Sequence, residues 1–138
     1  CTYCFNHKFN EMMKGKGKIL RRRSVDNVIE EIVGVANKYP LELVYFRDDS
    51  FNLIPEWIEE FSEKYSKIVK IPFVCTSHLN AMNDNIAKAL KKAGCVTVEL
   101  GIESGNTRVR NEILKRHMKD KTIIEGIKIL KFSSKVRE

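Results

Sequence analysis

Two cysteines near the start of the chain are spaced so that both can bind the same metal centre. They lie in the sequence Cys1-Thr2-Tyr3-Cys4-Phe5-Asn6-His7. A Cys-x-x-Cys loop is short enough for both sulfurs to face one point, so it can supply two ligands to a zinc ion or to an iron–sulfur cluster. The same spacing is also typical of thioredoxin-like dithiols. The pair alone leaves these three kinds of site open.

Further polar side chains follow the strands that the sequence predicts. Apolar runs rich in β-forming residues predict buried strands at 41–46, 71–76 and 95–102. The polar turns after them are Arg47-Asp48-Asp49-Ser50, Ser77-His78-Leu79-Asn80 and Glu103-Ser104-Gly105. The carboxyl ends of parallel strands meet at one edge of a sheet, where the binding sites of α/β proteins form. We therefore expect these turns and the cysteine loop to share one edge.

Helices are predicted between these strands, which makes the chain an α/β protein. The pattern predicts an irregular connection at 8–23, followed by helices at 24–38, 55–66, 83–93, 106–116 and from 120 onward. Their start and stop signals are Ser24, Pro55, Gly94 and Asn106. Strands joined by single helices run parallel, and right-handed crossovers place the helices on one side of a curving sheet or on both sides of an open one. We expect a single domain over 1–138.

Composition limits the functions that this chain can have. Its 138 residues, 43% of them hydrophobic, are enough for one core. The net charge of +7 is densest in Lys16–Arg23, called the basic segment below. Both a solvated loop and a phosphate- or nucleic-acid-binding surface remain open for it. No signal peptide or long apolar segment is present, and the cysteines do not form a disulfide framework, so we expect a reducing cytoplasm and no membrane partner.

Three motifs together resemble those of the radical SAM (S-adenosylmethionine) enzymes. The cysteine loop is similar to the last two-thirds of the C-x3-C-x2-C loop of that family. The segments 46–51 and 98–105 are similar to strand-end signatures of the branch whose members often carry a cobalamin-binding domain. The resemblance extends through about Leu130. It implies an incomplete (β/α) barrel, or partial TIM barrel, with parallel strands and outer helices.

The resemblance also implies cofactors and residues that bind them. It implies a 4Fe–4S cluster, with Cys1 and Cys4 as its second and third cysteine ligands, and SAM on the remaining iron. Tyr3 is expected near the adenine, the Arg47-Asp48-Asp49 turn near the methionyl amine, and Glu103 or Ser104 near the ribose or the carboxylate. The full expected SAM-binding set is Tyr3, Arg47, Asp48, Asp49, Ser77, Glu103, Ser104, and Arg108 or Arg110.

The implied reaction is reductive cleavage of SAM to a 5′-deoxyadenosyl radical, with electrons from a reductant of the flavodoxin or ferredoxin type. Cobalamin, if used, would be bound by a domain outside this chain. The family's first loop cysteine would precede Cys1 and the later strands are also lacking, so we expect a fragment that is inactive alone. Its unpaired strand edges are expected to favour self-association.

A different class of function also stays open at this stage. The chain could be a non-catalytic α/β module that binds a metal ion or nucleic acid. Zinc binding would combine the two loop cysteines with Cys75 and His78, a separation longer than in compact zinc fingers. Nucleic-acid binding would use the basic segment, although no aromatic residue there provides a stacking surface for bases.

Overall fold

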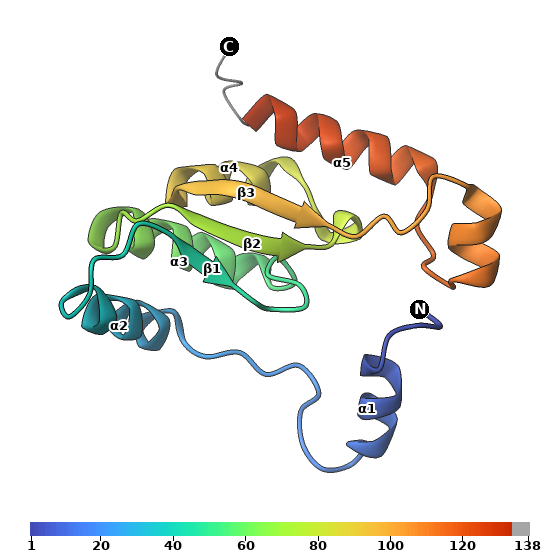
Figure 1. The fold of residues 1–138 in the computed structure, drawn as a ribbon, viewed down its shortest axis with the longest axis horizontal. Coiled ribbons are helices and arrows are strands. Elements are labelled where there is room, and N and C mark those ends of the chain that lie inside the picture. The colour runs from blue at the N-terminus through green and yellow to red at the C-terminus, as the bar shows by residue number, and fades with distance from the viewer. Residues whose placement is uncertain (134–138) are drawn as a thin grey trace.

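Three parallel strands form the centre of the protein. The structure is a computed structural model that describes residues 1–133, so the last part of the predicted domain, 134–138, lies outside the described residues. The strands are β1 (Val44–Phe46), β2 (Phe73–Ser77) and β3 (Cys95–Leu100), in the order β1-β2-β3. Their arrowheads point to the same side of the molecule (Figure 1). The prediction of a parallel α/β sheet is confirmed.

Helices α2 to α5 form one layer over one face of this sheet. Helix α2 packs against α3, α3 against α4, and α4 against α5, and α3 and α4 lie behind the strands in Figure 1. This one-sided arrangement is consistent with part of a (β/α) barrel, in which helices cover only the outer face. The helices are α1 (Asn6–Met12), α2 (Val25–Ala36), α3 (Pro55–Ile68), α4 (Asp84–Ala93) and α5 (Asp120–Ser133), with short turns η1 (Leu79–Ala81) and η2 (Val109–Ile113).

The hydrophobic core lies between β2 and the helix layer. Phe73 and Cys75 of β2 are fully buried, and so are Ile58, Phe61 and Tyr65 of α3. The rings of Phe61 and Phe73 meet edge to face at 5.6 Å between centroids. Burying each such side chain contributes about 1.5–3 kcal/mol. The face of the sheet that packs against the helices therefore supplies the hydrophobic core that stabilises the fold. The opposite face of the sheet does not contribute to this core.

Several helix ends are set by local residues, and those at Ser24 and Gly94 agree with the prediction. The Ser24 hydroxyl accepts a hydrogen bond from the Asn27 amide at 3.3 Å, and the Asn83 side chain accepts one from the Ile86 amide at 3.0 Å. Gly94 ends α4 with a φ of 97°, a left-handed conformation that glycine adopts without steric cost. Among residues 1–133 no helix has the length and apolar character needed to cross a bilayer.

Two predicted segments differ from the structure. Part of the connection expected at 8–23 is helical, because α1 covers Asn6–Met12, but α1 has no buried residue. The helix expected to run to Arg116 ends earlier, in the π-helical turn η2, where the Leu114 amide donates to the Val109 carbonyl at 2.9 Å. After it, Lys115 and His117 take a positive φ of 52°. The chain therefore turns back toward the sheet before Arg116.

Candidate functional site

The cysteine loop lies across the edge of the sheet at which the strands end. At one end, the Thr2 amide donates to the Leu114 carbonyl at 3.0 Å. At the other, Asn6 Nδ2 donates to Asp49 Oδ2 at 2.8 Å, in the turn after β1. The N-terminus therefore lies beside the arrowheads of the strands (Figure 1). The prediction that the cysteines, the acidic turn and the turn after β3 share one edge, called the rim below, is confirmed.

Cys1 and Cys4 lie on one tight turn of this loop. The Cys4 amide donates to the Cys1 carbonyl at 3.4 Å, and both thiols are half-buried and not bonded to each other. Two soft sulfur donors on one turn fit two ligands of an iron–sulfur cluster. Within the described part of the chain, no group of three or more His, Cys, Asp or Glu side chains could hold a metal ion. The four-ligand zinc site that would include Cys75 and His78 is therefore absent from residues 1–133.

Arg116 reaches the cysteine loop from the turn after η2. Its Nη1 lies 3.7 Å from the Cys1 sulfur, and its Nη2 donates to the Gly101 carbonyl at 2.7 Å. A Cβ added at Gly101 would lie 2.9 Å from Nη2 and 2.5 Å from a carboxylate oxygen of Glu103. The absence of a side chain at Gly101 therefore lets both charged groups approach the end of β3. The sequence prediction missed Arg116, because it was assigned to the end of a regular helix.

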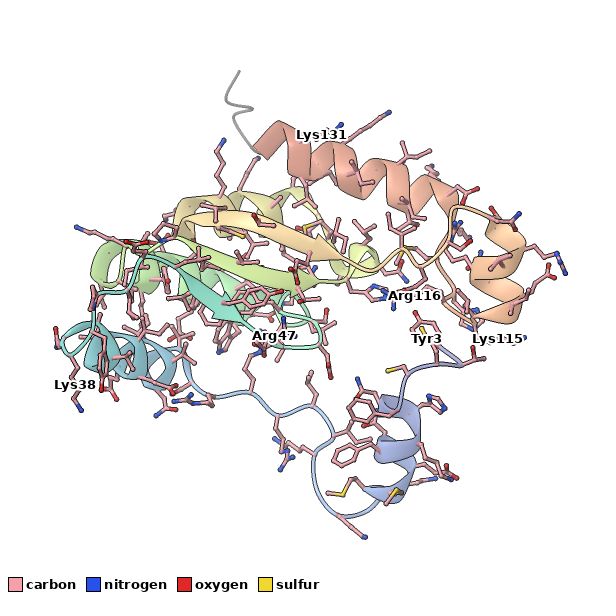
Figure 2. All side chains as sticks on the ribbon, viewed as in Figure 1. Tyr3, Lys38, Arg47, Lys115, Arg116 and Lys131 are labelled. Atoms are coloured by element: carbon pink, nitrogen blue, oxygen red, sulfur yellow. The ribbon has the colours of Figure 1, made fainter. Side chains whose placement is uncertain are left out.

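Tyr3 and Glu103 complete this group, and Tyr3 lies close to Arg116 in Figure 2. Burial raises the pKa of the Tyr3 hydroxyl, the Arg116 charge lowers it, and the charge of Glu103 and a hydrogen bond to it raise it again. The net pKa is above the usual value, so the hydroxyl stays protonated at neutral pH. Glu103 has a φ of 67°, a conformation that costs a non-glycine residue roughly 1–2 kcal/mol. This strained residue is the one whose side chain is hydrogen-bonded to Tyr3.

The sequence model of the radical SAM superfamily matches residues 1–133. The chain belongs to the radical SAM superfamily. It is 31% identical over 128 residues to an uncharacterized methyltransferase of Pyrococcus horikoshii, covering 92% of this chain and 28% of that protein. It is 27% identical over 118 residues to the cytidylyl-2-hydroxyethylphosphonate methyltransferase of Streptomyces wedmorensis, covering 84% of this chain and 21% of that protein. The chain thus spans about a quarter of the length of these relatives.

Membership of the radical SAM superfamily confirms the predicted family. It implies a 4Fe–4S cluster and SAM as the cofactors of the domain. The three parallel strands with helices on one face agree with part of the barrel that was expected for a radical SAM domain.

Two residues of the predicted SAM-binding set point away from the rim. Arg110 is 1% exposed, and its guanidinium donates to the Met118 carbonyl at 2.9 Å, to the Ser104 carbonyl at 2.7 Å, and to Asp120. All three nitrogens are used inside the protein, so Arg110 holds the turn after β3 together. Ser77 is buried on the helix side of β2, on the same side as Cys75. The structure does not bring either residue to the radical SAM site.

The acidic turn after β1 is at the rim, as predicted, but its side chains have partners in the protein. Arg47 stacks over the ring of Tyr45 with its guanidinium carbon 4.7 Å from the centroid. Asp48 lies 3.5 Å from an Arg22 nitrogen, and Asp49 accepts the hydrogen bond from Asn6. Both carboxylates are exposed and have lone pairs left for a ligand amine. Arg108 is also exposed, on the outside of the turn that leads into η2.

The face of the sheet without helices carries polar side chains. Tyr45 donates a hydrogen bond to Glu99, and Thr76 Oγ1 donates to Glu99 Oε2 at 3.4 Å. These three residues come from three different strands, so they form a row across the sheet. The hydrogen bond to Glu99 is the main cause of a raised Tyr45 pKa. The structure places Glu99 on this exposed, barrel-facing side.

Asn52 fixes the position of His78 at the rim. Asn52 is fully buried, its Nδ2 donates to the His78 carbonyl at 3.1 Å, and its Oδ1 accepts from the His78 amide at 2.9 Å. Burial and the charge of Arg116 together lower the pKa of His78. His78 is therefore neutral at neutral pH. Sequence reasoning missed Asn52, because a lone asparagine in a loop gives no signal of burial.

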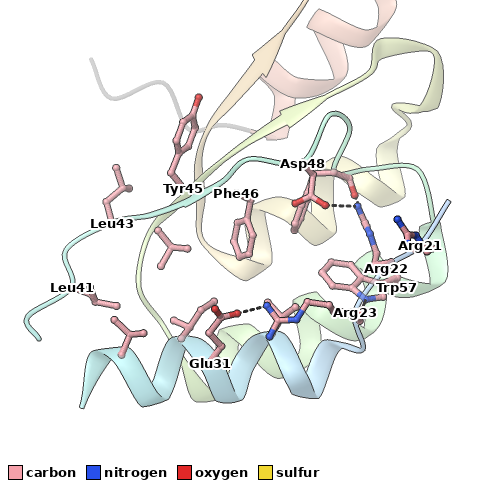
Figure 3. Close-up of a pocket in the computed structure, with 15 residues that line it drawn as sticks. Arg21, Arg22, Arg23, Glu31, Leu41, Leu43, Tyr45, Phe46, Asp48 and Trp57 are labelled. Carbon is pink, nitrogen blue, oxygen red and sulfur yellow. Dashed lines mark hydrogen bonds and ion pairs between the residues drawn. The ribbon is translucent and has the colours of Figure 1, made fainter. Parts of the chain in front are cut away.

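Two arginines of the basic segment, Arg22 and Arg23, pair with carboxylates of the same protein. Figure 3 shows Arg22 paired with Asp48 and Arg23 paired with Glu31, along a groove between α2 and the edge of β1. Arg22 also donates to the Phe51 carbonyl at 2.7 Å. Arginines that are used in this way give little support to nucleic-acid binding, in which they would contact phosphates.

Proposed function

We propose that this chain is the part of a radical SAM methyltransferase that holds the cluster and SAM. The observation that carries the proposal is the position of the Cys1–Cys4 turn at the rim. This turn, which includes Tyr3, lies beside Arg116 and Glu103, at the end of a sheet with one face that no helix covers among residues 1–133. In α/β folds, the carboxyl ends of the strands are where such cofactors bind. The whole enzyme would include chain beyond the quarter of its relatives that is spanned here.

Each residue of the rim has a role in this proposal. Cys1 and Cys4 bind iron as thiolates, with a third ligand from outside the chain. A 4Fe–4S cluster at this position would supply the electron that splits the sulfonium of SAM and yields a 5′-deoxyadenosyl radical. Tyr3 places its ring beside the adenine, and Glu103 accepts hydrogen bonds from the ribose hydroxyls. Asp49, next to the cysteine loop, accepts a hydrogen bond from the methionyl amine.

Methyl transfer is proposed because both relatives are named methyltransferases. The row of Tyr45, Thr76 and Glu99 would line the cavity in which the substrate is held. The hydroxyl and carboxylate oxygens of this row would orient a polar substrate, and the sheet behind them would keep water away from the reactive radical. Cobalamin bound by a further domain, and a flavodoxin- or ferredoxin-type reductant, are part of the same proposal.

The test uses the full-length protein that contains this chain, reconstituted with iron and sulfide without oxygen. We expect a stoichiometric 4Fe–4S cluster, and 5′-deoxyadenosine when SAM and dithionite are added, measured by absorption and mass spectrometry. Cys4→Ser is expected to lose most of the cluster, because one of its thiolate ligands is removed. Cys95→Ser is the matched control, because this thiol lies beside Cys75 on the helix side of the sheet, 3.9 Å between sulfurs.

Two results would contradict the proposal. One is a wild-type protein that holds a full cluster yet releases no 5′-deoxyadenosine. The other is a Cys4→Ser protein with the iron content of the wild type. Methyl transfer is tested separately with SAM that carries a deuterated methyl group, whose label is expected in the product of the reaction.

A further inference from the structure

Arg116 contacts the cysteine loop at the atom that would bind iron. We propose that Arg116 sets the reduction potential of the cluster by donating a hydrogen bond to the sulfur of Cys1. This inference rests on the proposed function, because it needs a cluster on that sulfur. Arg116 acts here as a positioning residue through Cys1 and does not touch the substrate.

The guanidinium of Arg116 is held in place by the end of β3. Its Nη2 donates to the Gly101 carbonyl at 2.7 Å, and this leaves Nη1 pointing toward the Cys1 sulfur at 3.7 Å. Sulfur is larger than oxygen and accepts hydrogen bonds at longer distances. Gly101 has no side chain, and a Cβ there would come within 2.9 Å of Nη2. The contact with Cys1 therefore depends on Gly101 in two ways, through its carbonyl oxygen and through its lack of a side chain.

The charge of Arg116 is only partly compensated by its surroundings. Its Nε is buried and has no hydrogen-bond partner in the described part of the chain. Glu103 is the carboxylate that faces it, beside Gly101. The half-buried guanidinium of Arg116 cannot lose its proton, so a negative group nearby stabilises it. A cysteine thiolate bound to iron provides such a group.

A donor and a positive charge beside a cluster sulfur favour the reduced cluster, which carries one more negative charge. Reduction here is the uptake of one electron from an outside reductant, and no bond of the protein is formed or broken. Arg116 therefore raises the potential and makes the cluster easier to reduce. Without Arg116, the same reductant would reduce a smaller share of the protein.

The experiment is a redox titration of the reconstituted full-length protein, with dithionite as the electron source and the signal of the reduced cluster read by electron paramagnetic resonance. In Arg116→Gln we expect a reduction equilibrium about tenfold less favourable, a fall in potential of about 59 mV for one electron. Lys115→Gln is the matched control, because it removes the same charge from the exposed neighbouring residue. We expect a much smaller change there.

A second variant covers the case in which Arg116→Gln does not hold a cluster. Gly101→Ala keeps every charge and every cysteine, but its methyl group displaces the guanidinium, so its potential is also expected to fall. An unchanged potential in Arg116→Gln overturns the inference. If Arg116→Gln holds no cluster, an unchanged potential in Gly101→Ala overturns it instead. An equal shift in Lys115→Gln overturns it as well, because a general charge effect then explains the result. A wild-type protein that assembles no cluster instead refutes the proposed function.

Discussion

Replacing Arg110 by methionine is expected to destabilise the protein strongly, although Arg110 lies away from the cofactor rim. Its side chain is 1% exposed and donates to the carbonyls of Ser104 and Met118 and to Asp120. Methionine fills much of the same volume but has no donor. The substitution therefore isolates the lost hydrogen bonds from the loss of packing.

The magnitude follows from the three partners. Each of the two carbonyls loses its donor, which costs about 1–3 kcal/mol for a buried polar group. Asp120 remains solvated because its side chain is 59% exposed, so losing this ion pair costs only about 0–1 kcal/mol. The Ser104 carbonyl is only partly buried, so the total lies near the low end of this sum, and the free energy of unfolding should fall by about 3 kcal/mol. That is a large part of the roughly 5–15 kcal/mol by which domains are stable.

Urea unfolding followed by circular dichroism measures this change. With an m-value of about 2 kcal/mol per molar, the midpoint should fall by about 1.5 M. Arg108→Met is the matched control on the exposed side of the same turn, and its unfolding free energy should stay within about 0.5 kcal/mol of the wild type. If Arg110→Met also stays within that range, the three contacts do not stabilise the turn and the reasoning is refuted.

Two further predictions concern backbone conformation and pH. Gly94→Ala should lower the unfolding free energy by about 1–2 kcal/mol because of the positive φ, whereas Gly34→Ala, inside α2 with open space around its Cβ, should raise it by about 0.5–1 kcal/mol. Thermal unfolding of both checks this, and shifts in the same direction would contradict it. The lowered His78 pKa means that the unfolded chain binds a proton more readily, so stability should fall as the pH drops through about 6.5. His78→Asn, which keeps an acceptor for the Asn80 amide, should flatten this part of the pH profile; identical slopes would count against the assignment.

Local signals made much of the fold predictable from the sequence. Ser24 and Gly94 each act on their own or neighbouring backbone, so their capping roles need no knowledge of the rest of the chain. The parallel order of the strands followed from the alternation of strands and helices. Ser77 shows a signal that was present but not used: it has the same parity as Phe73 and Cys75, which places all three on the buried side of β2.

Other features depend on contacts that the sequence does not display. Helix α1 buries no residue, so no apolar period could reveal it; Phe5 before it is 72% exposed. Arg116 meets Cys1 from the other end of the chain, and only the turn after η2 brings them together. The resemblance made Arg108 and Arg110 equal candidates for the SAM carboxylate. The structure separates them because one is exposed and the other is buried.

The segment from the π-helical turn η2 to Arg116 makes the rim sensitive to chain length as well as to residue type. A π-turn holds one residue more than an α-helical turn. Deleting a residue inside Val109–Ile113 would make η2 an ordinary α-helical turn and leave the direction of the chain after it nearly unchanged. Deleting Leu114 or Lys115 instead removes a residue without such compensation. Arg116 would then emerge on a different side, away from the cysteine loop. A scan of single-residue deletions should therefore damage cluster chemistry at Leu114 and Lys115 more than within η2, while leaving the sheet and its helix layer folded.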